Sequence, residues 1–267
     1  MKRKNRKFFN VILLSILILI GLTACGSSDE ANGSDSKNSG DLKDTYTVVS
    51  DTSFVPFEFK EDGKYVGFDI ELINAIADEA GFEINLETTN FDGIIPGLQT
   101  GSFDIAIAGI SITEERAKKI DYSDPYYESG LRIGVAADNE SIKSIEDLEG
   151  KTIATRLGST SATYIEENIE GAKANPYEQL DQAYLAVENG SADAILYDAP
   201  NVAYYIKTKG KDSLKMVGDL YQAEDYGIAI SKGNEKLVKA INEALATLKE
   251  NGKYDEIYEK WFGKKSE

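Results

Sequence analysis

Hydrophobic and polar positions follow two different periods along most of the chain. Apolar runs of strand length occur at 46–50, 103–108 and 151–156. Between such runs, apolar residues recur every three or four positions, which is the spacing of a helix with one buried face. Strand-like and helix-like stretches that alternate in this way predict an α/β protein with mixed, largely parallel sheets.

One predicted helix has clear sequence signals at both ends. Its apolar face carries Ile70, Ile73 and Ile76. Asp69 is placed to cap the start, and Gly81 can adopt the left-handed conformation that ends many helices.

A weak internal repeat indicates two similar lobes. GSFDIAI at 101–107 resembles GSADAIL at 190–196, and each joins the end of a helix to a strand. Eight residues beyond the glycine of each copy lie Gly109 and Asp198. Open α/β sheets bind ligands at the carboxyl ends of their strands, so both positions are candidates for one cleft.

Asp51 also follows a predicted strand and stands among aromatic residues. With Phe54 and Phe91 it could form a pocket that has apolar walls and one acceptor. The alternative is that Phe54 belongs to the ordinary core and that Asp51 caps a turn. The pattern alone leaves both interpretations open.

Two further stretches have the chemistry to bind an anion. Arg116 lies in the first turn of a helix that Thr113 caps, where a cation opposes the helix dipole. A bound carboxylate, also bonded by Ser111, would explain this arginine, although a solvated surface arginine is the alternative. LGSTS at 157–161 joins a strand to a helix, and its free N–H groups suit an anion as well as an ordinary cap.

The N-terminus has the features of a secretory lipoprotein. A basic opening precedes an apolar run from Phe8 to Ala24, so residues 1–24 are interpreted as a signal peptide. LTAC at 22–25 resembles the bacterial lipobox, which predicts cleavage before Cys25 and lipidation of its thiol, although a chance cysteine is the alternative. Residues 25–44 are polar and predict a flexible tether. The expected location is the extracytoplasmic face of the cell membrane, through the lipid anchor.

Composition excludes several kinds of chemistry. The chain has no histidine, one cysteine and a formal net charge of −17. With Cys25 lipidated, His- or Cys-based nucleophiles and metal sites are ruled out. We expect no cofactor, no metal and no nucleic-acid partner. The sequence contains no P-loop, so any ATP chemistry must lie on another chain.

Longer motifs identify a family. DTSFVPFEF, KYVGFDIEL, FDGIIPGLQTGSFDIAIAGISITEER, DYSDPYYESG, LYDAPN and NGKYDEIYEKWFG closely resemble the glutamine-binding proteins of bacterial amino-acid ABC importers. The resemblance runs from about Tyr46 to Gly263. It implies a type II periplasmic-binding-protein fold, in which two lobes joined by two hinge strands close over one amino acid. It also implies a monomer that delivers its ligand to the membrane permease and ATPase subunits of an importer.

The resemblance also implies the lobe boundaries. Lobe 1 is discontinuous and covers 45–129 and 221–263, and lobe 2 covers 130–220. The hinges lie near 126–130 and 221–227. The last helix has an apolar stripe that we expect to pack on lobe 1. The stripe consists of Tyr254, Ile257, Tyr258, Trp261 and Phe262.

Carried over position by position, the resemblance assigns roles to the candidate residues. Asp51 meets the side-chain amide of the ligand, and Phe54 and Phe91 enclose its methylene groups. Gly109 and Asp198 take the ammonium group, with the Ser111 hydroxyl nearby. Arg116, helped by the backbone at Thr160, takes the carboxylate.

Four positions depart from the family pattern. Ser111 stands for a threonine, Thr160 for a glycine, Arg156 for a lysine and Tyr197 for a histidine. Arg156 and Tyr197 would touch the ligand side chain. With Asp51 asking for a donor and Arg156 for an acceptor, glutamine is the expected ligand. Arginine or another polar amino acid is the alternative.

Two alternatives come from other classes of protein. The fold also resembles that of cyclohexadienyl dehydratases, in which case Asp51, Glu58 or Asp198 could serve as acid or base. The other alternative is a ligand-sensing or adhesive surface lipoprotein that meets no permease. An assay for prephenate or arogenate turnover separates the first from a receptor, and uptake by a deletion strain separates the second.

Overall fold

A computed structural model describes residues 42–264. The predicted signal peptide, Cys25 and nearly all of the predicted tether lie outside these residues. Within 42–264, no helix is long and apolar enough to cross a membrane.

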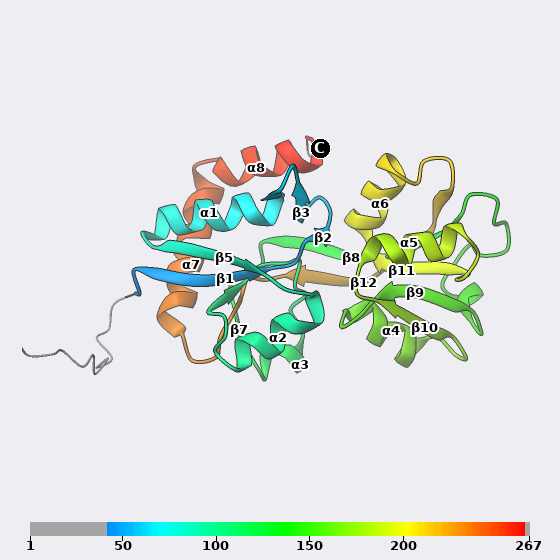
Figure 1. The fold of residues 1–267 in the computed structure, drawn as a ribbon, viewed down its shortest axis with the longest axis horizontal. Coiled ribbons are helices and arrows are strands. Elements are labelled where there is room, and N and C mark those ends of the chain that lie inside the picture. Colours follow the sequence, from blue (N-terminus) through cyan, green and yellow to red (C-terminus); the bar gives the residue numbers. More distant parts are fainter. Residues whose placement is uncertain (1–41, 265–267) are drawn as a thin grey trace, which may run out of the picture. The chain divides into compact units, whose positions relative to one another are not determined.

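The first of two large sheets combines strands from both ends of the described chain (Figure 1). β1 pairs in parallel with β5 and β6, whereas β13 is antiparallel to β6 and β7. The strand order is β5 (Glu83–Thr88), β1 (Thr45–Ser50), β6 (Ile105–Ala106), β13 (Ala229–Ile230) and β7 (Asp121–Tyr122). The helices of this part are α1 (Phe68–Ala80), α2 (Phe91–Gln99), α3 (Glu114–Ala117), α7 (Glu235–Glu250) and α8 (Lys253–Phe262).

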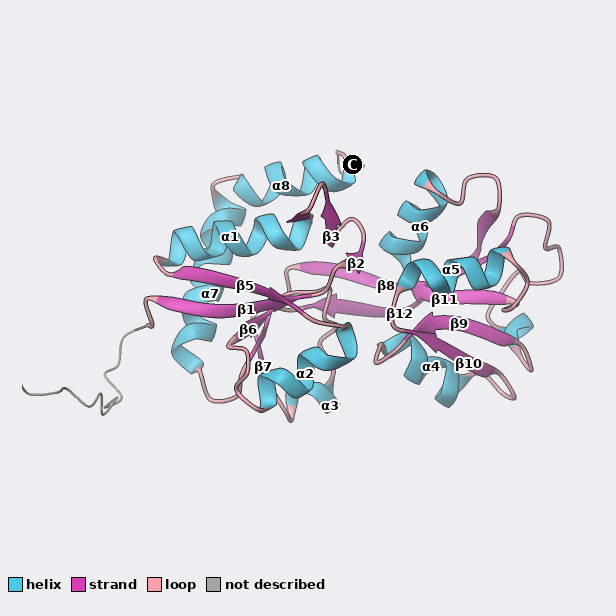
Figure 2. Ribbon diagram, viewed as in Figure 1, coloured by secondary structure: helices cyan, strands magenta, loops and turns pink. Residues whose placement is uncertain are grey.

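The second large sheet is built from the middle of the chain (Figure 2). β9 is parallel to β10 and β11, and β8 is antiparallel to β11 and β12. The order is β10 (Lys173–Tyr177), β9 (Thr152–Arg156), β11 (Ala194–Asp198), β8 (Tyr127–Ala136) and β12 (Leu214–Tyr226). The helices here are α4 (Thr160–Asn168), α5 (Leu180–Glu188), α6 (Ala199–Thr208) and the short 3₁₀ turn η1 (Glu146–Leu148).

These sheets confirm the predicted α/β class with mixed sheets. A third, small antiparallel sheet precedes α1 and consists of β2 (Ser53–Phe54), β3 (Glu58–Glu61) and β4 (Lys64–Val66). The predicted strand at 103–108 is shorter than expected, since ladder pairing is confined to β6.

Two long strands, β8 and β12, belong to the second sheet and run back towards the first. They pair antiparallel, with register shifts between Val217 and Tyr221 and between Tyr221 and Glu224. An isolated bridge then joins Tyr226, at the end of β12, to Ser111. The chain thus passes between the two sheets in the segments predicted as hinges, while the lobe boundaries stay a proposal.

The two ends of α1 differ in how well the sequence predicted them. Gly81 ends the helix with φ of 77°, as expected. Asp69 is not the cap, because Gly67 holds that position and Asp69 lies inside the first turn. Its side chain is fully buried and accepts hydrogen bonds from groups outside the helix. A short acid near a helix start fits both arrangements, so the sequence could not separate them.

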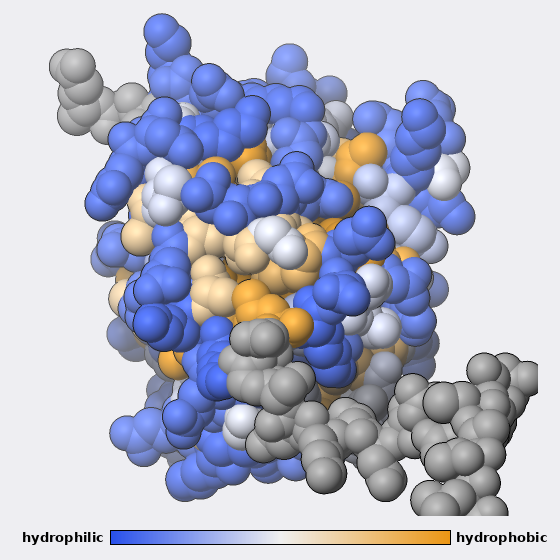
Figure 3. All heavy atoms as spheres, turned by 90° about the vertical axis from the view of Figure 1, so that its left-hand side faces the viewer, coloured by the Kyte–Doolittle hydropathy of each residue, from blue (hydrophilic) through white to orange (hydrophobic). Residues whose placement is uncertain are grey.

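The apolar stripe of α8 packs as predicted. Phe262 contacts Phe57 and Phe68, Tyr254 contacts Phe68, and Trp261 lies against Phe59. Through these aromatic contacts, α8 packs against the hydrophobic core that lies around the first sheet. On the face drawn in Figure 3, hydrophilic residues surround a smaller apolar area.

Candidate functional site

The ends of three strands bring charged residues from both sheets together. Asp51 follows β1 of the first sheet, Arg156 ends β9 and Asp198 ends β11 of the second. All three side chains are buried. The parallel strands therefore place these residues where open α/β sheets bind ligands.

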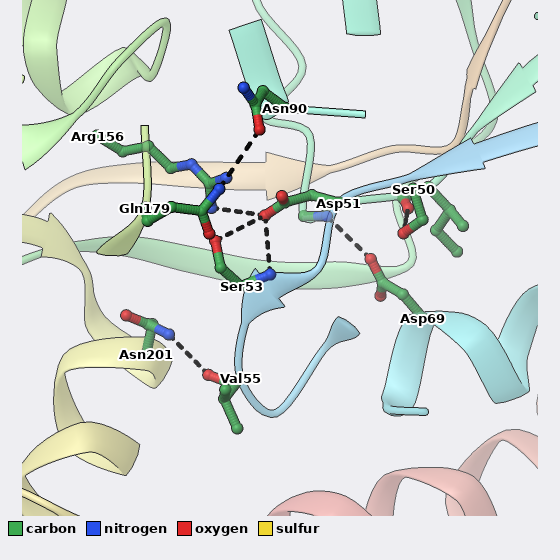
Figure 4. Close-up of polar contacts among 11 residues, drawn as sticks. Ser50, Asp51, Ser53, Val55, Asp69, Asn90, Arg156, Gln179 and Asn201 are labelled. Carbon is green, nitrogen blue, oxygen red and sulfur yellow. Dashed lines mark hydrogen bonds and ion pairs between the residues drawn. The ribbon is translucent and has the colours of Figure 1, made fainter. Parts of the chain in front are cut away.

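Asp51 and Arg156 form a buried ion pair (Figure 4). Arg156 Nη1 lies 2.6 Å from Asp51 Oδ2, and each side chain is only 1% exposed. The backbone N–H and the hydroxyl of Ser53 donate to the same Oδ2, each at 3.3 Å. Asp51 Oδ1 and Arg156 Nε and Nη2 have no hydrogen-bond partner among the described residues. The pair thus leaves one acceptor and two nitrogen donors unused.

This pairing is a contact that the sequence argument did not include. Asp51 and Arg156 were expected at the two ends of the side-chain pocket, Asp51 to accept from a donor of the ligand and Arg156 to donate to an acceptor. In the structure their charges neutralise each other directly. The two residues meet because β1 and β9 end opposite each other. A single sequence does not reveal that these two strands, from different sheets, come together.

The two phenylalanines of the predicted pocket have different surroundings. Phe54 packs against Phe57 and Tyr197, and its ring fills the space in which a Cβ on Gly109 would lie. Phe91 lies under the Arg156 guanidinium, with 5.3 Å from Cζ to the ring centroid. Phe54 is thus part of the core, as one alternative held, while both rings still border the candidate site.

Arg116 reaches across to the second sheet's side of the site. Its Nη1 donates to the Ser111 carbonyl at 3.1 Å, and Nη2 donates to the Gly158 carbonyl at 3.0 Å. The guanidinium also lies 5.7 Å from the Phe91 centroid. Thr113 caps the short helix α3 as predicted, by accepting from the Arg116 N–H. The arginine is half-buried rather than fully solvated.

Glu224 is a functional candidate that the sequence reasoning missed. Its carboxylate accepts from the Ser111 hydroxyl and, at 2.9 Å, from the Thr160 hydroxyl. Gln222 donates to its other oxygen at 2.6 Å. Glu224 lies on β12 in a chain rich in acidic residues, so no sequence signal marked it. It links the hydroxyls of two residues that were predicted to lie at the ligand, although the group predicted for Thr160 was its backbone.

Asp198 is bonded to the end of the other long segment. It accepts a hydrogen bond from the Tyr226 hydroxyl, whose oxygen also lies 3.0 Å from the Ser129 hydroxyl oxygen. Burial, together with the negative charge of Glu224, raises the pKa of Asp198 to about 7 against the hydrogen bond from Tyr226. A cationic ligand group beside this buried carboxyl would stabilise its ionised form.

A surface groove of about 640 Å³ contains part of the predicted site. Phe91, Arg116, Gly158 and Thr160 contribute to its lining. Asp51, Phe54, Gly109, Ser111, Arg156, Tyr197 and Asp198 lie beneath the surface. The side chains of Asp51, Arg156, Ser111 and Asp198 bond protein groups, so a ligand must replace some of those partners. Within 42–264, no group of three or more His, Cys, Asp or Glu side chains is placed to hold a metal ion.

Comparison with known proteins places the chain in a family. The model of the bacterial extracellular solute-binding proteins, family 3, matches residues 46–264. The L-cystine-binding protein TcyJ of Escherichia coli K12 is 32% identical over 253 residues, which cover 94% of this chain and 93% of TcyJ. The glutamine-binding protein GlnH of Bacillus subtilis 168 is 35% identical over 273 residues, which cover 96% and 97%.

Solved structures of amino-acid-binding proteins are similar to this chain in both sequence and fold. An ancestral arginine-binding protein bound to glutamine is 44% identical, with a TM-score of 0.80 over 84% of this chain and all of that one. AncCDT-1, an ancestral amino-acid-binding protein described as a precursor of cyclohexadienyl dehydratase, is 43% identical, with a TM-score of 0.76 over 82% and 96%. The chain therefore belongs to the bacterial extracellular solute-binding proteins, family 3.

Proposed function

We propose that this protein is the extracytoplasmic receptor of an ABC importer and binds a polar L-amino acid, with glutamine as the preferred ligand. The family and the amino-acid binders among the similar proteins support a receptor. The observation that carries the choice of ligand is the set of unused polar atoms on the Asp51–Arg156 pair.

A carboxamide suits these atoms because it has a donor and an acceptor side by side. Its NH₂ group can donate to Asp51 Oδ1 while its oxygen accepts from Arg156 Nε or Nη2. The positive charge of Arg156 would repel the guanidinium of an arginine ligand or the side-chain ammonium of a lysine ligand. The negative charge of Asp51 would repel the side-chain carboxylate of glutamate. Like charges repel strongly in a poorly solvated pocket, so the ion pair favours a neutral polar side chain.

The common part of an amino acid finds complementary groups nearby. The carbonyl of Gly109 and the carboxyl of Asp198 are the proposed acceptors for the ammonium group, with the Ser111 hydroxyl beside them. Arg116 is the proposed partner of the carboxylate, helped by the backbone at Thr160. Phe54 and Phe91 border the path of the side chain, and Tyr197 packs against Phe54.

Closure of two lobes on the ligand is part of the proposal. Lobe 1 would comprise 45–129 and 221–263, and lobe 2 would comprise 130–220. In the structure the two sides meet through Asp51 and Arg156, through Arg116 and Gly158, and through the Asn201 amide, which donates to the Val55 carbonyl at 2.7 Å. A ligand shifts a population only if it binds one arrangement better than another.

We therefore expect glutamine to reduce the radius of gyration that small-angle scattering measures in solution. The ligand adds contacts to both lobes, so it stabilises arrangements in which they are close. An equal radius of gyration with and without saturating glutamine would mean that the lobes do not move on binding.

Lipid anchoring through Cys25 is a separate proposal, because this residue lies outside the described range. We expect Cys25→Ser to release the protein into the medium or the periplasm and to leave glutamine affinity unchanged. The acyl chains supply membrane binding, whereas the candidate site begins at Asp51. Fractionation and calorimetry on the same preparation check this, and a variant that stays with the membrane would disprove the anchor.

An enzyme of the dehydratase type is the second candidate. It is favoured by the resemblance to AncCDT-1 and by the raised pKa of Asp198, which could hold a proton for transfer. Assays with prephenate and arogenate decide between the two: turnover supports the enzyme, and binding of glutamine without turnover supports the receptor.

A further inference from the structure

Two carboxyl groups beneath the candidate site lie side by side and are completely buried. Glu58 begins β3 and Asp69 lies in the first turn of α1, and both are 0% exposed. The Asp69 N–H donates to the carbonyl of Phe57, the neighbour of Glu58, at 2.9 Å. This bond holds the two backbone segments together, and the Glu58 and Asp69 side chains are close enough to interact with each other directly.

These carboxyl groups lack enough donors if both are ionised. Neither oxygen of Glu58 has a partner in the described part of the chain, and neither does Asp69 Oδ1. The other oxygen, Asp69 Oδ2, accepts from the Tyr126 hydroxyl at 2.8 Å and from the Gly109 N–H at 2.9 Å. Buried polar atoms without partners are costly, and buried like charges more so.

The surrounding charges do not compensate for two ionised carboxylates. Within residues 42–264, Arg156 is the only buried basic side chain, and Asp51 already neutralises it. The other groups that interact with Glu58 or Asp69 are tyrosines, which are neutral. They are Tyr126 just before β8, Tyr127 at its start, Tyr197 on β11 and Tyr254 on α8.

We propose that Glu58 and Asp69 share one proton in an O–H···O hydrogen bond, and that this pair positions Gly109 for ligand binding. A proton on Glu58 supplies the donor that Asp69 Oδ1 lacks and removes one of two adjacent buried charges. Asp69 then remains the acceptor that holds the Gly109 N–H. The shared proton is independent of the proposed function, whereas the role of Gly109 rests on it.

Gly109 shows why such positioning matters. Its φ is 54°, and a side chain at this position would overlap the Phe54 ring. Its N–H is occupied by Asp69 and by the Tyr126 oxygen at 3.2 Å. The carbonyl is therefore the group that Gly109 can offer to an ammonium ion, and its direction depends on the anchored N–H.

Electrostatics gives the sign of the pH dependence. Burial raises the pKa of Glu58 well above its usual value, and the Asp69 and Asp51 charges raise it further. Burial also raises the pKa of Asp69 to about 7, against the lowering effect of its hydrogen bonds. Acids with raised pKa values bind more protons in the folded state, so the stability they contribute is complete near pH 4 and is lost as pH rises through about 7.

Glu58→Gln tests the pair directly, because an amide donates the same hydrogen bond but does not titrate. Glu61→Gln is the matched control, since Glu61 is exposed on the same strand. We expect the infrared band of a protonated carboxyl group to lose intensity in Glu58→Gln and not in Glu61→Gln. The fall in stability between pH 5 and pH 8, measured by urea unfolding, should flatten only in Glu58→Gln.

Asp69→Asn tests the same pair from the other side and serves if Glu58→Gln fails to fold. Its amide can donate to Glu58 and accept from Gly109, so the same flattening is expected. Ionisation of Asp198 strengthens ammonium binding over the same pH range, so glutamine affinity, measured by calorimetry, is compared between variants. The wild type and Glu61→Gln should share one pH profile, and both pair variants should lose the part of it in which affinity weakens as the pair ionises. An unchanged carboxyl band and a wild-type pH profile in the variants would overturn the shared proton. If the wild type binds no amino acid, the proposed function fails, while the infrared and unfolding results still decide the proton.

Discussion

Arg116→Lys is expected to weaken amino-acid binding by about 2–5 kcal/mol, the cost of spoiling a desolvated charge pair. Arg116 holds the Ser111 and Gly158 carbonyls with two different nitrogens, which fixes the plane of its guanidinium between the two sides of the site. A lysine ammonium is a point charge and cannot keep both bonds while it pairs with a carboxylate. Calorimetric titration with glutamine measures the loss.

Arg132→Lys is the matched control for this variant. Arg132 lies on β8 and lines a different surface cavity, so the same change from arginine to lysine can be made there. Its affinity for glutamine should equal that of the wild type. Wild-type affinity in Arg116→Lys would instead place the ligand carboxylate elsewhere.

Arg156→Met is expected to lower the free energy of unfolding by about 3–5 kcal/mol, because it leaves Asp51 buried and without its countercharge. Methionine keeps much of the side-chain volume, so the loss reports the charge rather than a cavity. Urea unfolding in the absence of ligand measures it. The exposed Lys209–Asp181 pair supplies the control, since Lys209→Met should cost only about 0–1 kcal/mol.

Arg156→Met should also change which amino acid the protein binds most tightly. With Arg156 removed, an incoming guanidinium can take its place beside the negative charge of Asp51 and over the Phe91 ring. Arginine should then stabilise Arg156→Met more than glutamine does. Asp51→Asn combined with Arg156→Met should regain part of the lost stability, because no buried charge is left unpaired. A double variant as unstable as Arg156→Met would assign the loss to packing.

The sequence predicted the parts of the fold that local rules govern. Gly81, Thr113 and the strand that ends at Arg156 lie in the predicted kinds of element, because turn conformation and apolar runs depend on neighbouring residues. Asp51 and Asp198 could be located at strand ends for the same reason. The roles of these residues in binding stay predictions.

The remaining features depend on which distant segments meet. Asp51 pairs with Arg156 across two sheets, and Glu224 joins Ser111 to Thr160, contacts that no spacing in the sequence encodes. Asp69 matched the pattern of a helix cap, yet its burial against Gly109 makes it a support for the site. Acidic residues are frequent in this chain, so the buried ones could not be separated from the solvated ones.

Competition calorimetry at one pH tests the central claim most directly, with glutamine, asparagine, glutamate, arginine, lysine and histidine offered to the wild-type protein. We predict that glutamine binds most tightly. The binding free energy of asparagine should be weaker than that of glutamine by about 1–3 kcal/mol, because its side chain carries the same amide but is one methylene group shorter. Glutamate, arginine and lysine should bind more weakly, since each brings a charge to the Asp51–Arg156 pair. Arginine binding as tightly as glutamine, or no binding by any of the six, would contradict this account.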